Sequence, residues 1–248
     1  MICKNCGHKI EGNFCSNCGQ DSEVDKINAK YLFKEISHSI LKLDKGFFYT
    51  VKELFTRPGY SIRDYLQGKR KNHYKPISFV IITATIYLLS TLITGERTFL
   101  SDFFYGAISG LDDKEFTTIS NTFKWGAKNY TYITLIFMPL FSFASFVSFR
   151  KAGYNYFEHL IINCYIKGVQ IILYSVFCFL IHWTNNDIYI LPIIALSLSI
   201  VYLIWFYMQF FDKKTAIYIA TRIVLAYFLY FILIGSLFIV IMAMILKN

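Results

Sequence analysis

Long apolar runs dominate the pattern of hydrophobic and polar positions beyond residue 76. Each run holds close to the ~20 apolar residues with which an α-helix crosses the hydrocarbon layer of a bilayer. The pattern predicts an all-α polytopic membrane protein whose transmembrane domain occupies 76–248, with a longer connection at 95–128. The five transmembrane helices are expected at about 77–94, 131–149, 164–183, 188–211 and 215–246.

The region 28–75 is too polar to cross a membrane and too apolar to be a linker. Its apolar residues recur every three or four positions, which predicts amphipathic juxtamembrane helices. Gly46 is expected to end the first, and Arg57-Pro58-Gly59 to break the second. The helices are predicted over Ala29–Leu43, Phe47–Phe55 and Ser61–Gln67. Two interpretations stay open, since the helices can lie among lipid headgroups or pack on the ends of the transmembrane helices.

Two near-identical knuckles, Cys3–Gly7 and Cys15–Gly19, open the chain, and each reads Cys-x-Asn-Cys-Gly. A C-x2-C knuckle brings two sulfurs together, and two knuckles complete a tetrahedral shell with metal–sulfur distances of about 2.3 Å. The glycine after each knuckle permits the tight turn. We interpret residues 1–22 as a zinc ribbon. The predicted ligands of a structural Zn²⁺ are Cys3, Cys6, Cys15 and Cys18.

A pair of disulfides, an iron ion or a redox pair would use the same four cysteines. No apolar leader precedes Cys3, so the knuckles are expected in the reducing cytoplasm, where disulfides are rare. A shell of four thiolates suits zinc or iron. With four protein ligands no coordination position stays open, so catalysis at this ion is not expected.

Composition and charge predict location and orientation. The 248 residues are 55% hydrophobic and 19% aromatic, with a mean hydropathy of +0.44 and a net charge of +9. Residues 1–76 carry fourteen Lys and Arg against eight Asp and Glu, whereas the loop 95–128 carries four against five. Because positive loops stay inside, we expect a multi-pass protein of the bacterial cytoplasmic (inner) membrane, with a cytoplasmic N-terminus, an external loop 95–128 and an external C-terminus.

One face of the third predicted transmembrane helix is polar. Its residues are separated by 4, 4, 3 and 4 positions, which places them on one side of a helix. They are His159, Asn163, Lys167, Gln170 and Tyr174. The face can line a pathway for a polar or anionic ligand; alternatively, Lys167 reaches the membrane surface and Glu158 and His159 have capping or headgroup roles.

A basic run leads into the first transmembrane helix. Lys69, Arg70, Lys71 and Lys75 are expected to contact anionic phospholipid, where each charge contributes ~1 kcal/mol. The alternative is that the run only sets the orientation of the chain.

Several short segments stand in a characteristic order along the chain. They are the two Cys-x-Asn-Cys-Gly knuckles, Leu43–Phe47, Leu54–Gly59 with its Arg-Pro-Gly, Arg63–Arg70 with its Gly-Lys-Arg, and Pro76. A further segment of this kind is Tyr156–Leu160. Across residues 1–80 the chain resembles an uncharacterised bacterial family of zinc-ribbon-headed membrane proteins, known only as a domain of unknown function. The resemblance implies a cytoplasmic ribbon fused to a polytopic inner-membrane region and no assigned reaction.

Three function classes are compatible with these features. The favoured one is a non-enzymatic adaptor or regulator whose zinc ribbon docks a cytoplasmic or membrane protein partner. The second is a small transporter or permeability pathway that uses the polar face, as a homo-oligomer. The third is a headgroup-level lipid-modifying enzyme that uses Glu158, His159 and the basic run.

No catalytic residue is assigned. The chain contains no H-E-x-x-H, G-x-S-x-G or G-x-x-x-x-G-K-[ST] motif. Membrane lipids are expected partners. Nucleic acid is not, because the basic residues cluster beside the membrane and the ribbon is small.

Overall fold

The computed structural model describes residues 1–37, 43–94, 125–126, 129–184, 190–212 and 214–245. Across these ranges the chain forms eight α-helices and one short 3-10 helix, Arg150–Ala152. The only extended pairing in them is two isolated β-bridges near the N-terminus, Ile2 with Lys9 and Phe14 with Asp21. The predicted all-α class is confirmed.

The apolar helices lie close to the ranges expected from the sequence, with one exception. The third begins at Tyr156, eight residues before the expected 164, because Asn155 and Glu158 cap its N-terminus. The others differ from the expected ranges by no more than two residues. The apolar helices are α4 (Pro76–Ile93), α7 (Tyr130–Ser148), α8 (Tyr156–Thr184), α9 (Ile190–Phe210) and α10 (Ala216–Ile245).

Four of the described helices are long and apolar enough to cross a membrane: α4, α8, α9 and the stretch Ala216–Leu237 of α10. The described apolar part of α7, Tyr132–Ser148, is shorter. This composition indicates a multi-pass membrane protein. The predicted loop 95–128, apart from 125–126, and the C-terminal residues 246–248 lie outside the described residues.

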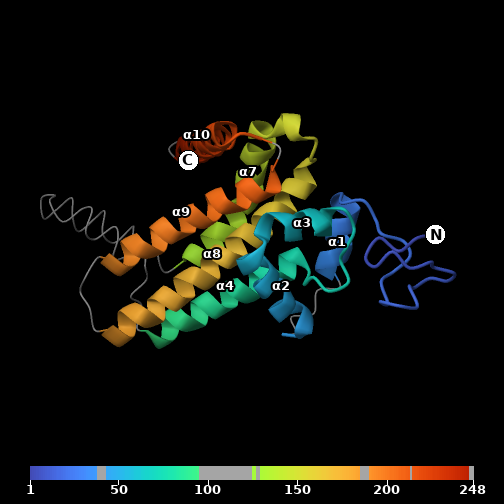
Figure 1. The fold of residues 1–248 in the computed structure, drawn as a ribbon. Coiled ribbons are helices and arrows are strands. Elements are labelled where there is room, and N and C mark those ends of the chain that lie inside the picture. The colour runs from blue at the N-terminus through green and yellow to red at the C-terminus, as the bar shows by residue number, and fades with distance from the viewer. Residues whose placement is uncertain (38–42, 95–124, 127–128, 185–189, 213, 246–248) are drawn as a thin grey trace, which may run out of the picture.

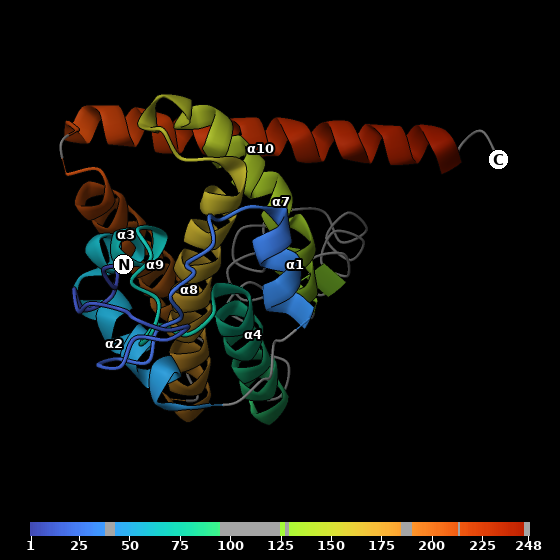
Figure 2. The same cartoon turned by 90° about the vertical axis from the view of Figure 1, so that its right-hand side faces the viewer.

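Helices α4, α8 and α9 lie side by side, and α7 packs on α8 (Figures 1 and 2). Helix α10 lies across this bundle and contacts α7 and α9 (Figure 2). Many of its large apolar side chains, including Phe228 and Phe231, are exposed. The prediction that 215–246 crosses the membrane as a fifth helix therefore rests on the length and composition of α10 and not on its orientation relative to the bundle.

Three short helices pack on the end of the bundle nearest the N-terminus (Figure 1). They are α1 (Ala29–Ser37), α2 (Lys45–Thr56) and α3 (Pro58–Leu66), and together with residues 67–75 we call them the collar. Phe47 of α2 contacts Phe79 of α4, and their ring centroids are 5.5 Å apart. The contacts in the structure therefore agree with the interpretation in which these helices pack on the ends of the transmembrane helices. Contact between these helices and lipid headgroups stays a prediction.

Two expected boundaries in the collar were wrong. Gly46 does not end the first helix but lies in the first turn of α2, because the Asp44 carboxylate accepts hydrogen bonds from the Gly46 and Phe47 amides. Helix α3 begins at Pro58 and not at Ser61, since proline is well suited to the first helical position, where no backbone donor is needed. Whether α1 extends beyond Ser37 concerns residues outside the described ranges.

Close packing of α4 on α8 depends on Gly168. Ring atoms of Phe79 occupy the position that a Cβ at residue 168 would take. Phe79 and Tyr165 are both buried at this contact, with ring centroids 5.7 Å apart. A small residue at a helix crossing lets the two backbones approach closely, as is common in membrane bundles.

We expect Gly168→Ala to destabilise the protein by about 1–3 kcal/mol, because the added methyl group forces Phe79 to move. Gly235→Ala is the matched control, since no described atom other than its neighbours and own helix lies within 4 Å of a Cβ there. The thermal unfolding midpoint in detergent should fall for the first variant and not for the second. Equal midpoints for the two variants would contradict the proposed packing.

Candidate functional site

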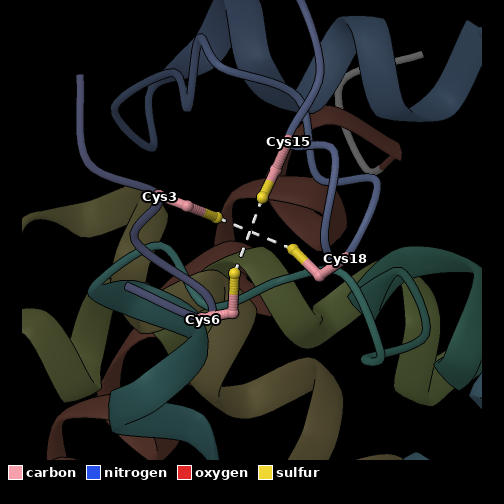
Figure 3. Close-up of side chains that lie close together, drawn as sticks. All are labelled: Cys3, Cys6, Cys15 and Cys18. Carbon is pink, nitrogen blue, oxygen red and sulfur yellow. Dashed lines mark hydrogen bonds between the residues drawn. The ribbon is translucent and has the colours of Figure 1, made fainter. Parts of the chain in front are cut away.

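The four cysteines of residues 1–22, which we call the ribbon module, meet at one point (Figure 3). Cys3 Sγ lies 3.6 Å from Cys18 Sγ, Cys6 Sγ lies 3.5 Å from Cys15 Sγ, and all four sulfurs are within 4.8 Å of one another. A tetrahedral shell with metal–sulfur distances of about 2.3 Å has edges of about 3.8 Å. The four thiols could therefore hold one metal ion. They are not disulfides, because that bond needs about 2.05 Å.

Local backbone geometry explains how the two knuckles place their sulfurs. In each, the glycine amide donates to the carbonyl of the first cysteine: Gly7 to Cys3 (2.9 Å) and Gly19 to Cys15 (2.7 Å). Gly7 and Gly19 have φ of 75° and 69°, which L side chains rarely adopt. The repeated Cys-x-Asn-Cys-Gly pattern thus specifies two equivalent turns.

Gln20 fastens the ribbon module to the collar. Its buried side-chain amide donates to the Gly68 carbonyl (3.0 Å) and accepts from the Arg70 and Lys71 amides (3.0 and 3.1 Å). Lys71 Nζ returns a hydrogen bond to the Gly19 carbonyl (2.9 Å). Three hydrogen bonds to one buried side chain fix its orientation, so the module has a fixed seat on residues 68–71.

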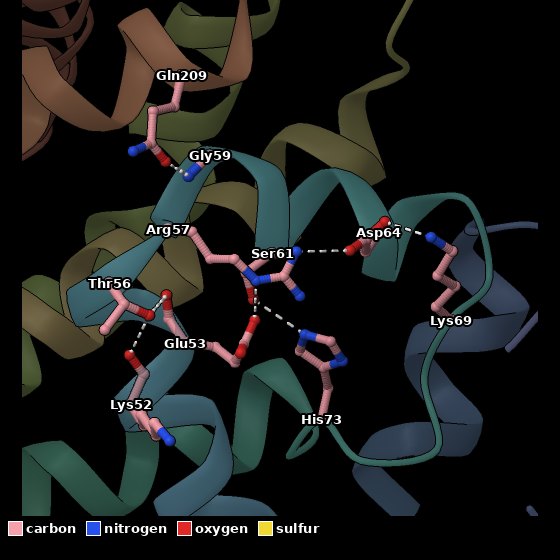
Figure 4. A network of polar contacts seen from close by, with 10 residues as sticks. All are labelled: Lys52, Glu53, Thr56, Arg57, Gly59, Ser61, Asp64, Lys69, His73 and Gln209. Carbon is pink, nitrogen blue, oxygen red and sulfur yellow. Dashed lines mark hydrogen bonds and ion pairs between the residues drawn. The ribbon is translucent and has the colours of Figure 1, made fainter. Parts of the chain in front are cut away.

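Helix α3 fastens the collar to the end of α9. Arg63 Nη2 donates to the carbonyls of Gln209 and Phe210, both at 2.6 Å, and Nη1 pairs with Asp212 at 3.0 Å. The Gly59 amide donates to Gln209 Oε1 at 3.2 Å (Figure 4). A Cβ at residue 59 would collide with this part of α9. The glycine of the Arg-Pro-Gly segment is therefore required by a close approach of two backbones.

Charged groups brace the collar internally (Figure 4). Arg57 pairs with Glu53 (2.6 Å) and with Asp64 (3.2 Å), and Asp64 also binds Lys69 (2.8 Å). His73 Nε2 is hydrogen-bonded to Ser61 Oγ at 2.9 Å. Burial lowers the pKa of His73, although the charges of Glu53 and Asp64 act in the opposite direction.

Residues of the basic run that are predicted to touch anionic lipid make contacts inside the protein. Lys69 binds Asp64, and Lys71 binds the Gly19 carbonyl. Arg70 donates to the carbonyls of Tyr65 (3.1 Å) and Asp25 (3.0 Å) and lies over the rings of Tyr31 and Tyr65. Lys75 directly precedes α4 and is exposed. Lipid contact by these residues stays a prediction.

The polar face predicted for the third span lies on α8 and is directed into the bundle. His159, Asn163, Gln170 and Tyr174 are each 6% exposed or less, and Lys167 is partly exposed. Three of these side chains are hydrogen-bonded to serines: His159 Nδ1 to Ser145 Oγ (3.0 Å), Asn163 Nδ2 to Ser142 Oγ (3.1 Å) and Tyr174 OH to Ser199 Oγ (2.9 Å). Among the described residues, His159 Nε2, Asn163 Oδ1 and Gln170 Oε1 are buried without a hydrogen-bond partner.

Glu158 and His159 do not form a joint site. The Glu158 carboxylate accepts from the Asn155 amide (2.7 Å), and the Glu158 amide donates to Asn155 Oδ1 (2.9 Å), so this residue caps α8. The ring of His159 lies inside the bundle against Phe149 and Ser145. The two side chains therefore point to different surroundings.

Glu35 is a buried acid that the sequence did not single out. Its Oε1 accepts from the Ile77 amide in the first turn of α4 (3.0 Å), so α1 caps the first bundle helix. Burial raises the pKa of Glu35 to about 7, although the Ile77 amide and the charges of Lys75 and Arg70 act in the opposite direction.

Comparison with known families gives one match. A family model described as "Protein of unknown function (DUF3667)" matches residues 44–88, which comprise α2, α3, residues 67–75 and most of α4. No curated protein and no solved structure matches the chain. The match agrees with the resemblance to an uncharacterised domain, and its residues are those that join the ribbon module to the bundle.

We expect Glu35→Gln to change how stability depends on pH. The raised pKa means that the folded protein holds a proton that the unfolded chain loses, so the wild type should lose up to about 3 kcal/mol as pH rises from about 4.5 to about 7 and no more above that. Thermal unfolding in detergent from pH 4.5 to 8 should show this loss for the wild type and for Glu23→Gln, an exposed control. Parallel curves for the wild type and Glu35→Gln would contradict the assignment.

Proposed function

We propose that this protein is a non-enzymatic membrane adaptor or regulator, in which a structural Zn²⁺ shapes the ribbon module into a docking head on the cytoplasmic side of a bacterial inner membrane. The observation that carries the proposal is the continuous chain of contacts from the cysteines through Gln20 to residues 68–71, and from α3 to Gln209 and Phe210. A head that is held in this way has a fixed position relative to the membrane.

The donor set supports zinc. Among the described residues the donor set consists of four cysteine sulfurs, and a closed shell of this kind is typical of structural zinc sites and leaves no position for substrate. Iron fits the same shell. The ion's contribution would be structural: the module buries few apolar residues besides its cysteines, Ile10 among them, so metal binding must supply much of its folding free energy.

Exposed apolar side chains on the ribbon module support a partner of protein character. Ile2 is 72% exposed and Phe14 is 65% exposed. Each directly precedes the first cysteine of its knuckle, so the two residues occupy equivalent positions. Aromatic and aliphatic side chains on a rigid support are the usual anchors of protein interfaces.

The adaptor function predicts a partner that contacts the ribbon module. A photoreactive amino acid at Phe14 of the full-length protein should give a discrete cross-linked protein in cells, and one at exposed Lys52 should not. Substituting Ile2 with Ser should reduce the yield at least fivefold without loss of metal, because it removes an apolar contact only. Cys3→Ser with Cys15→Ser should abolish both metal content and the adduct.

Two results would contradict the adaptor function. One is an adduct pattern at Phe14 that is the same as at Lys52. The other is an adduct at Phe14 that persists unchanged in the double cysteine variant while elemental analysis finds no metal.

A second candidate function, a pathway for small polar or anionic solutes along α8, is favoured by the burial of the polar face. Buried polar atoms without partners are unfavourable unless water or a ligand meets them, and three lie on this face. A pathway would require an oligomer, since the apolar helices of a single chain enclose too little volume for a solute.

The pathway predicts chloride efflux from proteoliposomes that is faster than from empty vesicles. Lys167→Leu should slow it at least fivefold, because the charge that attracts the anion is lost. Lys151→Leu makes the same change at an exposed position away from the polar face and should leave efflux unchanged. Efflux no faster than that of empty vesicles, or equal efflux of the two variants, would contradict this function.

A further inference from the structure

A cavity of about 610 Å³ opens between α2 and the segment that leads into α4. Its walls include Lys45 and Tyr49 from α2, and Lys71, Asn72 and Lys75 from the segment. This volume lies within the range of about 300–1,000 Å³ that is usual for small-molecule sites. All ten lining residues fall within 44–88, the part of the chain that matches the family model.

The lining is strongly basic. Three lysines contribute to it against one carboxylate, that of Asp44. Asp44 Oδ1 is engaged by the Gly46 and Phe47 amides, so it serves the N-terminus of α2. The site's attraction for an anion therefore comes from its lysines and not from the helix end.

Within the described part of the chain, two of these lysines are not engaged in a salt bridge. Neither Lys45 nor Lys71 is in an ion pair among the residues that the structure describes. Lys71 donates to the Gly19 carbonyl, which is a neutral acceptor. Lys69 is ion-paired with Asp64, and Arg70 donates to the Tyr65 carbonyl. Neither lines the cavity, whereas Lys71 and Lys75 do.

The polar neighbours suit a phosphate group. Lysine recognises phosphate as a point charge, and the Tyr49 hydroxyl and the Asn72 side-chain amide of the lining can each donate a hydrogen bond. The cavity adjoins Pro76, where the first apolar helix begins, and thus lies at the level at which headgroups are expected.

We propose that this cavity binds a phosphate-bearing anion, with Lys45, Lys71 and Lys75 as the charged contacts. The ligand is the headgroup of an anionic phospholipid or a small soluble phosphate, which share the chemistry that the lysines recognise. The site is separate from the four cysteines, and its occupancy does not depend on the adaptor function.

The test uses full-length protein in neutral detergent and calorimetric titration with two probes, inorganic phosphate and short-chain phosphatidylglycerol. The wild type should bind at least one of them saturably. Lys45→Ala with Lys71→Ala should raise the dissociation constant at least tenfold, because two charged contacts are lost. Lys30→Ala with Lys52→Ala removes the same charge from exposed positions outside the cavity and should change it less than twofold.

Each outcome bears on the proposal. Binding of phosphate identifies a soluble source, binding of phosphatidylglycerol alone identifies a headgroup, and either supports the site. Lys45→Ala alone leaves the hydrogen bond between Lys71 and Gly19 in place and therefore does not disturb the ribbon module. This single variant should raise the dissociation constant at least threefold. No saturable binding of either probe, or equal losses in the two double variants, would overturn the proposal.

Discussion

The ends of the bundle helices impose the constraint on which the rest of the structure depends. The first amides and last carbonyls of any helix have no partner within it, and leaving them unsatisfied away from water costs a few kcal/mol each. The collar supplies partners: Arg63 for the last carbonyls of α9, and Glu35 for the Ile77 amide in the first turn of α4. The bundle thereby fixes the collar, and the collar through Gln20 fixes the ribbon module.

Features encoded by short-range patterns could be predicted from the sequence. The cysteine knuckles specify their own turns, and the glycine after each has the positive φ that the pattern requires. The apolar runs give helices at the expected places, since length and hydropathy act over about 20 residues. The spacing on α8 places His159, Asn163, Gln170 and Tyr174, which are all buried, on one side of the helix, because helical periodicity is a local property.

Features that depend on distant parts of the chain could not be predicted in this way. Arg63 and Asp212 are 149 positions apart, and nothing near either residue indicates the other. The basic run looked uniform in sequence, yet Lys69 and Arg70 brace the collar whereas Lys71 and Lys75 line a cavity. Glycine has a low helix propensity, so Gly46 was expected to end a helix. It lies instead in the first turn of α2, because the Asp44 carboxylate accepts a hydrogen bond from its amide.

The attachment of α3 to α9 has a consequence for biogenesis. Gly59 and Arg63 leave the ribosome some 150 residues before the carbonyls and carboxylate that they bind. At a synthesis rate of about 5–20 residues per second, this interval is roughly 8–30 s. During that time Arg63 and the Gly59 amide lack these partners, and the attachment of the collar forms only after the end of α9 has been synthesised.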